Sequence, residues 1–101
     1  MAKKTTKAAQ RRPVLVTTAH RGVFFGYLVD EVEAGEGYST VTLEGARCAI
    51  RWSTTKGFLE LADVGPNSNS KIGALAPRIV LRKVTSLADC SETAAAAWER
   101  A

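Results

Sequence analysis

The only histidine of the chain lies beside an arginine and a glycine, in a small polar stretch between two apolar runs. His20, Arg21 and Gly22 follow the letters TTA and precede VFF. Imidazolium and guanidinium groups donate charge-assisted hydrogen bonds to phosphate and carboxylate oxygens. The glycine suits a tight reversal of the chain. The stretch therefore predicts a cationic hairpin tip that binds an anion. The alternative is a solvated turn that happens to be cationic.

Two further loops carry a lysine among small polar residues. Thr55 and Lys56 belong to STTKG, which would bring hydroxyl groups, backbone N–H groups and an ammonium group to the start of a helix. Asn67 and Lys71 belong to GPNSNSKIG. Neither loop matches the Walker pattern, and each has an ordinary alternative, a capped helix and a surface loop. Three cationic, glycine-containing loops together favour a local anion pocket.

Two aromatic residues are candidates to stack on the base of a nucleotide. Phe25 belongs to the apolar run after the histidine stretch, and Trp52 ends a second β-rich run, where a tryptophan also serves as a core anchor. We expect either ring to meet the base, and the cations to meet the phosphates. The complete set of expected ligand-binding residues is His20, Arg21, Gly22, Phe25, Trp52, Thr55, Lys56, Asn67 and Lys71.

The sequence does not favour metal binding or catalysis. His20, Cys48 and Cys90 form no C-x-x-C or H-x-x-x-H pair, so we expect no metal site and no cofactor. No nucleophile accompanies the histidine in a recognisable pattern, so we expect no catalytic residue and no enzyme. The two cysteines are expected to be free thiols, because the chain has the features of an intracellular protein.

The charge of the chain is unevenly distributed. The net charge is +4, but residues 1–12 contain five of the 14 basic side chains and no acid. Residues 13–101 therefore hold nine basic and ten acidic side chains, a net charge of −1. We expect residues 1–12 to be a disordered basic tail and residues 13–101 to be one small domain. A nucleic-acid-binding fold concentrates cations on its own surface, so a nucleic-acid partner is expected only through the tail.

The periodicity of the chain predicts the elements that position these residues. Residues 14–18 and 23–32 read as a hairpin with a turn at 19–22, and residues 34–37 as a flexible connector. Residues 38–43, 46–52 and 78–87 read as further strands, the last with an ambiguous inner face, and residues 44–45 as a turn or bulge. Val41 and Leu43 mark a core face. Residues 56–64 read as a short helix, with a strand as the alternative because Gly57 falls in its first turn. Residues 92–100 read as a helix capped by Ser91 and docked by Trp98.

These elements define a mainly β, α+β fold. We expect a small, strongly bent antiparallel sheet or partly open β-barrel, with a short middle helix and a C-terminal helix that covers an edge or an end. No apolar run is long enough to span a bilayer, and the N-terminus lacks a signal peptide, so no membrane partner is expected.

Four separated segments resemble one protein family. They read VTTAHRGVFFGYL, ARCAIRW, GFLELADVGP with the following KIG, and AAWE, in that order between Val14 and Trp98. They are similar to a family of small proteins of unknown function encoded by tailed bacteriophages and prophages. The resemblance implies a phage or prophage origin and the cytoplasm of a bacterial host. It implies no activity, ligand or catalytic residue.

The candidate residues and the resemblance together favour a non-enzymatic phage accessory protein that binds a small anionic, nucleotide-type ligand. One candidate for this ligand is a host defence signal, which the protein would sequester. A subunit of this size needs an interface to enclose such a ligand, so we expect a homo-oligomer. Two alternatives stay open. One is a nucleic-acid-binding module that uses the basic tail, and the other is a structural or assembly protein of the phage particle.

Overall fold

The computed structural model describes residues 12–20, 22–52, 57 and 59–101. The expected tail at residues 1–12 therefore lies outside the described residues except for Arg12. The elements, in chain order, are β1 (Pro13–Thr18), β2 (Val23–Gly35), β3 (Tyr38–Arg51), α1 (Glu60–Asp63), β4 (Lys71–Ile72), β5 (Ala76–Asp89) and α2 (Glu92–Arg100).

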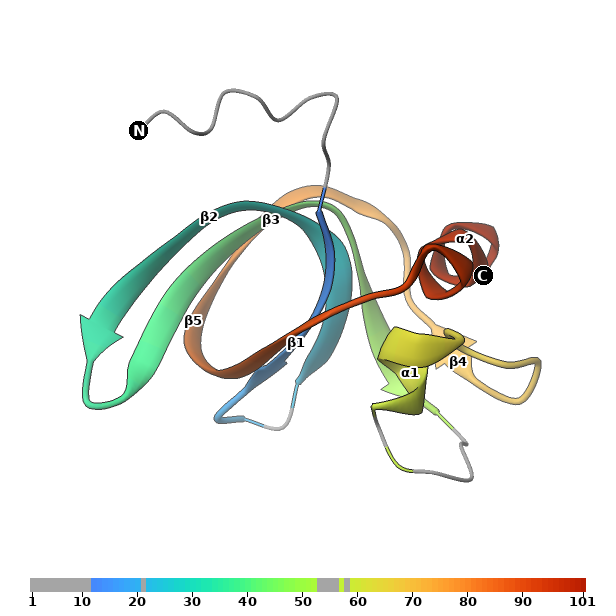
Figure 1. Cartoon of the computed structure of the whole chain (residues 1–101), viewed down its shortest axis with the longest axis horizontal. Coiled ribbons are helices and arrows are strands. Elements are labelled where there is room, and N and C mark those ends of the chain that lie inside the picture. The colour runs from blue at the N-terminus through green and yellow to red at the C-terminus, as the bar shows by residue number, and fades with distance from the viewer. Residues whose placement is uncertain (1–11, 21, 53–56, 58) are drawn as a thin grey trace.

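Four of the strands close a ring of antiparallel pairs. β1 pairs with β2 and β5, and β3 pairs with the same two strands, while the short β4 adds to the end of β3. The ends of β2 and β3 farthest from the helices extend beyond the ring as a long hairpin (Figure 1). The expected bent antiparallel sheet with a short middle helix and a C-terminal helix is confirmed.

β5 closes the ring because it changes partner along its length. Its first half pairs with β3, up to Ser39 opposite Val84, and its second half pairs with β1, from Thr18 opposite Val84. Lys83 lies at this change with a φ of 55°, a left-handed conformation that is uncommon outside glycine. The ambiguous inner face of this strand follows from the change, because the two halves lie against different neighbours.

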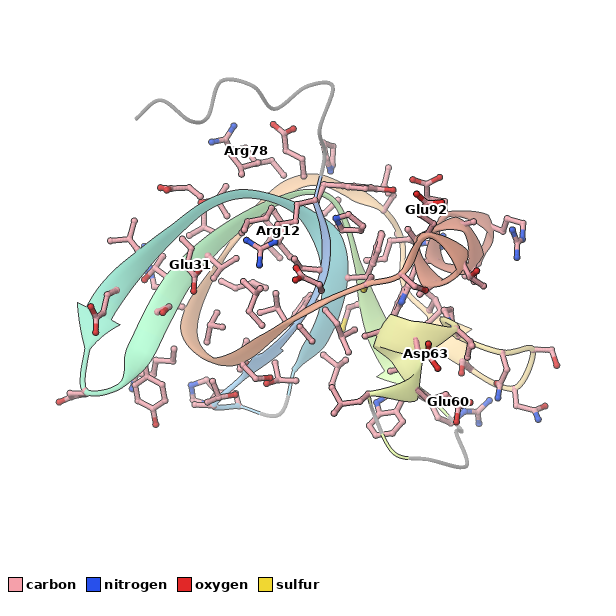
Figure 2. The ribbon with its side chains drawn as sticks, in the orientation of Figure 1. Arg12, Glu31, Glu60, Asp63, Arg78 and Glu92 are labelled. Atoms are coloured by element: carbon pink, nitrogen blue, oxygen red, sulfur yellow. The ribbon has the colours of Figure 1, made fainter. Side chains whose placement is uncertain are left out.

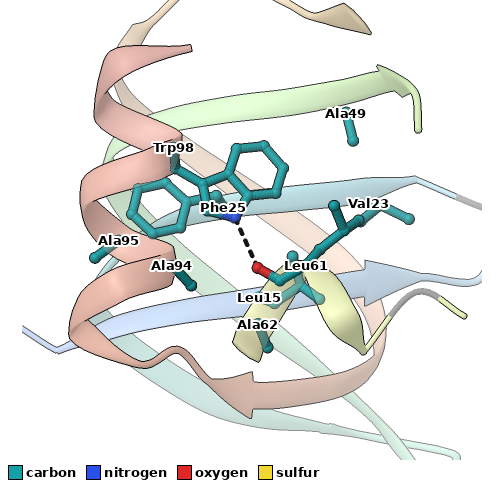
Figure 3. Close-up of a cluster of buried hydrophobic side chains, with 9 residues drawn as sticks. All are labelled: Leu15, Val23, Phe25, Ala49, Leu61, Ala62, Ala94, Ala95 and Trp98. Atoms are coloured by element: carbon teal, nitrogen blue, oxygen red, sulfur yellow. Dashed lines mark hydrogen bonds between the residues drawn. The ribbon is translucent and has the colours of Figure 1, made fainter. Parts of the chain in front are cut away.

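Two apolar clusters lie on opposite faces of β1. Leu15 belongs to the first cluster, between the sheet and the two helices, and Val14 and Val16 belong to the second, inside the ring. Trp98 of α2 is fully buried in the first cluster, where its ring stacks on Phe25 and its Nε1 donates to the Leu61 carbonyl at 3.0 Å (Figure 3). The expected docking of the last helix through Trp98 is confirmed.

Other local predictions have mixed outcomes. Ser91 caps α2 by accepting from the Ala94 N–H at 3.0 Å, and both cysteines are free, as expected. Val41 and Leu43 are fully buried. Residues 44–45 are a bulge within one continuous strand. The expected flexible connector at residues 34–37 is instead the end of β2, residues 34–35, and a tight two-residue turn, residues 36–37, and three consecutive residues, 35–37, have positive φ.

The middle helix is shorter than expected. α1 covers only Glu60–Asp63, while residues 56 and 58 of the expected helix lie outside the described residues. Gly57 has a φ of 86°, which a helix cannot contain. Within the part of the chain that the structure describes, no helix has the length and apolar character needed to cross a membrane.

Candidate anion-binding groove

An open groove of about 620 Å³ lies where the β1–β2 hairpin tip meets the middle of β5. We call it the tip groove. It is lined by Thr18, His20, Gly22, Phe24, Val80, Leu81 and Arg82. Three of these residues come from β5 and the others from β1, β2 and the turn that joins them. The groove therefore lies where two segments far apart in the sequence meet. The turn between β1 and β2 lies next to the middle of β5 in the ribbon (Figure 1).

Backbone hydrogen bonds hold the hairpin tip against β5. The Thr18 N–H donates to the Gly22 carbonyl at 3.0 Å, and the Gly22 N–H donates to Thr18 Oγ1 at 3.1 Å. The Ala19 N–H donates to the Lys83 carbonyl at 2.9 Å. The left-handed conformation of Lys83 is thus tied to the tip, and it fixes the backbone next to Arg82. Unusual backbone conformations of this kind concentrate at functional sites.

The floor of the groove is apolar. Phe24 packs on the cluster inside the ring, and Leu81 belongs to that cluster. Val80 lines the groove with 51% of its surface exposed. A Cβ at Gly22 would lie 2.7 Å from Phe24 Cε1, so the aromatic ring packs directly against the tip backbone. This floor offers a flat ring and an aliphatic side chain to a planar ligand.

The rim of the groove is cationic. His20 and Arg82 are exposed and line it, and Lys83 adjoins it in sequence. Within the described part of the chain, neither Arg82 nor Lys83 forms an ion pair, whereas Arg12 pairs with Asp89 at 2.7 Å and Arg78 with Glu44 at 3.5 Å. A guanidinium without a carboxylate partner is available to bind a phosphate in two hydrogen bonds.

The groove offers no activated thiol. Cys48 is the Cα partner of Phe24 on the neighbouring strand, and burial raises the pKa of its thiol. A raised pKa keeps the thiol protonated and weakly nucleophilic at neutral pH. No carboxylate or cysteine is found among the described residues that line the groove. The described lining residues include groups that can bind an anion, the Arg82 guanidinium and the Thr18 hydroxyl.

The structure brings together only part of the expected site. His20 and Gly22 line the tip groove, and Arg21, which joins them in the chain, lies outside the described residues, as do Thr55 and Lys56. Trp52, Asn67 and Lys71 do not line the groove. Asn67 Oδ1 accepts from the Asn69 N–H at 3.0 Å and from Ser70 Oγ at 3.2 Å, which closes its own loop.

The expected stacking role of Phe25 is wrong. Phe25 is 1% exposed, and its ring lies 5.3 Å from that of Trp98 at an interplanar angle of 7°. Successive side chains of a strand point to opposite faces, so Phe24 reaches the groove and Phe25 enters the core below the helices. Trp52 lies one residue beyond β3 with 36% of its surface exposed, so it is not a core anchor.

Sequence reasoning missed several residues of the groove. The alternation of Phe24 and Phe25 was a usable signal, but it does not say which face the helices cover. Arg82 lies in a strand with an ambiguous face, and only the change of partner along β5 places it beside the hairpin tip. Thr18, Val80 and Leu81 carry no chemical signal of their own, and they join the groove through the ring closure.

The ring of strands and its covering helices define a small antiparallel β protein with a C-terminal helix. Residues 11–98 match the model of a domain of unknown function (DUF6948), and the chain belongs to this family. The match contains every residue that lines the tip groove. The resemblance to an uncharacterised family is therefore confirmed. No curated protein and no solved structure matches the chain.

Proposed function

We propose that this protein binds a small anionic ligand of the nucleotide type in the tip groove, without chemical turnover. The observation that carries the proposal is the convergence of Phe24, His20 and Arg82 on one groove. An aromatic floor with a cationic rim is complementary to a planar base joined to a phosphate.

Each part of the groove has a role in this proposal. The base lies on Phe24 and against Val80, while Arg82 and His20 bind the phosphate oxygens. Thr18 Oγ1 accepts from the Gly22 N–H, so its hydroxyl proton is left to donate to the ligand. The absence of acids among the described lining residues supports an anionic ligand, because a carboxylate would repel it.

The biological setting of the proposal comes from the resemblance to phage and prophage proteins. A binding protein without turnover, present in an infected bacterial cytoplasm, removes a signalling nucleotide by sequestering it. Self-association is part of this proposal, because the tip groove is open and a second subunit would cover a ligand that one subunit leaves exposed.

Isothermal titration calorimetry tests the proposal with the four common nucleoside monophosphates, a nucleoside and inorganic phosphate. At least one monophosphate is expected to bind more tightly than either the nucleoside or the phosphate. Arg82→Gln is expected to weaken that binding by about tenfold or more, since a hydrogen bond to a charged group contributes about 1.5–3 kcal/mol. Phe24→Leu is expected to weaken nucleoside and nucleotide alike, and phosphate little.

Arg78→Gln is the matched control. Arg78 is an exposed arginine of the same strand, it pairs with Glu44, and it lies on the side of the ring away from the hairpin tip (Figure 2). Its replacement is expected to leave nucleotide binding unchanged. Equal losses in Arg82→Gln and Arg78→Gln, or no binding of any monophosphate to the wild type, would contradict the proposal.

A further inference from the structure

The hairpin of β2 and β3 has an open edge beyond the ring of strands. β1 pairs with β2 only between Val23 and Tyr27, and Pro13 faces Tyr27 in the last pair. From there to Gly35, β2 pairs with β3 along one edge, and no strand among the described residues pairs with its other edge. The hairpin projects from the ring on the side away from the helices (Figure 1). An open strand edge offers N–H and C=O groups to another extended segment.

The described part of the chain begins beside this edge. The Leu28 N–H donates to the Arg12 carbonyl at 2.9 Å, one residue beyond the last pair of β1 and β2. The two strands are antiparallel, so an extended chain before Arg12 runs towards the turn of the β2–β3 hairpin. Residues 1–11 span up to roughly 36 Å at about 3.3 Å per residue, and the open edge at residues 29–35 spans roughly 23 Å. The preceding segment is therefore long enough to cover the edge.

The open edge and the preceding segment carry opposite charges. Residues 28–37 contain four acidic side chains and no basic one, whereas residues 1–11 contain four basic side chains and no acidic one. The acids are Asp30, Glu31, Glu33 and Glu36. All four are exposed, and none forms an ion pair with a residue that the structure describes (Glu31 is labelled in Figure 2). Opposite charges on neighbouring strands stabilise their pairing.

The charges favour the chain's own basic segment over a second copy of the same edge. Two β2 edges paired with each other would bring acids against acids, which destabilises a pair of strands. Counted on from the last pair of β1 and β2, Lys7 comes opposite Glu33, and Arg11 comes one residue from Asp30. Residues 2–11 contain no proline, so every one of them has an N–H for the pairing.

A bulge in β2 leaves acids within reach in either register. β2 has one more residue than β3 between Leu28 and Asp30, so a strand on its open edge can be shifted by one position. Successive side chains point to opposite faces, which puts Glu31 and Glu33 on one face of the hairpin and Asp30 on the other. A lysine of the preceding segment therefore has an acid opposite or diagonally opposite on either face.

We propose that residues 5–11 pair with the open edge of β2 and extend β1 along the β2–β3 hairpin. Lys7 and Arg11 bind the acids of the hairpin in this arrangement. The proposal does not depend on ligand binding in the tip groove. It gives the basic segment a partner within the molecule, in place of the nucleic acid considered from the sequence.

Charge reversal on each side tests the pairing in the full chain. The tail variant is Lys7→Glu, Arg11→Glu, the edge variant is Asp30→Lys, Glu33→Lys, and the swap variant contains all four changes. Hydrogen exchange followed by nuclear magnetic resonance reports on the amides of residues 29–35. Alternate amides there are expected to exchange at least tenfold faster in the tail and edge variants than in the wild type, because like charges then face one another. The swap variant is expected to restore slow exchange.

The matched control is Lys71→Glu, Arg100→Glu. It changes the net charge as much as the tail variant does, but on exposed residues of β4 and α2. Its exchange at residues 29–35 is expected to equal that of the wild type. The amide of Val41, a fully buried residue of β3, is expected to exchange equally slowly in all five proteins, which excludes a folding defect.

A zero-length cross-link identifies the chain that supplies the segment. A carbodiimide joins a lysine amine to a carboxylate in contact with it, with loss of water. In an equal mixture of unlabelled and heavy-nitrogen-labelled protein, Lys7 is expected to join Glu31 or Glu33 of a chain with the same label. Exchange in the wild type as fast as in the tail variant, no restoration in the swap variant, or an equal acceleration in the control would overturn the proposal. Cross-links between differently labelled chains would also overturn it and would assign the edge to the basic segment of a second copy.

Discussion

Trp98 joins the last helix to the rest of the molecule through three different contacts. Its ring stacks on Phe25, its surface is fully buried, and its Nε1 binds the carbonyl of Leu61 in α1 (Figure 3). Phe25 in turn meets the edge of Tyr27, with the ring centroids 5.4 Å apart. One residue of α2 therefore connects both helices to β2, which explains why Phe25 is unavailable to a ligand.

Trp98→Ala is expected to lower the free energy of unfolding by about 3–5 kcal/mol, because it removes a large buried ring. Trp98→Phe keeps most of the ring but leaves the Leu61 carbonyl without its donor, at a cost of about 1–3 kcal/mol. Urea denaturation measures both values. Trp52→Ala serves as the control and is expected to cost less than about 1 kcal/mol, since Trp52 is partly exposed. Similar losses for the two alanine variants would contradict the assigned role of Trp98.

Cys90 makes the stability of the fold sensitive to alkaline pH. Burial, and then the neighbouring Asp89 carboxylate, raise the pKa of the Cys90 thiol from 9.0 to about 12. Below the unfolded pKa both states hold the proton, so this contribution to stability is complete there. As the pH rises from 9.0 towards about 12, the unfolded thiol ionises while the folded one stays protonated, so stability falls.

Cys90→Ala is therefore expected to lose less stability than the wild type when the pH rises through this range. Urea denaturation under reducing conditions, at about pH 8 and about pH 10.5, measures the two changes. The stability that the variant loses through poorer packing is the same at both pH values. It therefore drops out when the change in unfolding free energy between the two pH values is calculated for each protein. Parallel changes in both proteins would show that the thiol does not titrate differently in the folded state.

At the scale of elements, one arginine holds the end of α2 and the start of the β4–β5 connection together. Arg47 of β3 donates to the Gly73 carbonyl, to the Trp98 carbonyl at 3.1 Å and to the Ala101 oxygen. A cation at the C-terminal end of a helix also interacts favourably with the helix dipole. These contacts join β3, β4 and α2 through one side chain.

Arg47→Lys is expected to lower the free energy of unfolding by about 1–2 kcal/mol, because an ammonium group cannot reach all three carbonyl oxygens in the planar geometry of a guanidinium. Amide exchange is expected to accelerate in the last turn of α2. Arg100→Ala, which removes the basic residue of that turn itself, is expected to cost about 0.3–1 kcal/mol. If the two variants lost equal stability, the contacts of Arg47 would not explain its effect.

Local periodicity predicted the strands and the last helix because each element buries one face of its own. Residues 14–18, 23–32 and 92–100 agree with β1, β2 and α2 to within a few residues. The long-range features did not follow from such patterns. The acceptors of Arg47 lie 26 and 51 residues further along the chain, and no local pattern records them.

The residues of the candidate site also fall into those that a local pattern predicts and those that depend on contacts between distant parts of the chain. His20 and Gly22 could be predicted because they share one turn. Arg82 and Phe24 could not, because their positions depend on how β5 changes partner and on which face of β2 the helices cover.

At the scale of the whole molecule, the two apolar clusters depend on one strand. β1 contributes Leu15 to the cluster below the helices and Val14 and Val16 to the cluster inside the ring. β1 also bonds on both edges, to β2 and to β5. Neither cluster can open without disturbing the strand that the other one needs, so the fold should unfold as one cooperative unit.

Leu15→Ala is expected to destabilise both clusters equally, by about 2–5 kcal/mol, although the side chain touches only the first. Hydrogen exchange at the Trp98 indole N–H reports on the first cluster, and exchange at the Val41 amide reports on the second. The opening free energies at these two positions are expected to fall by the same amount. Asp30 and Glu33 are exposed residues of the β2–β3 hairpin and belong to neither cluster, so their amide exchange is expected to be the same in both proteins. If the opening free energy fell at Trp98 but not at Val41, the ring of strands would open independently of the helices that cover it.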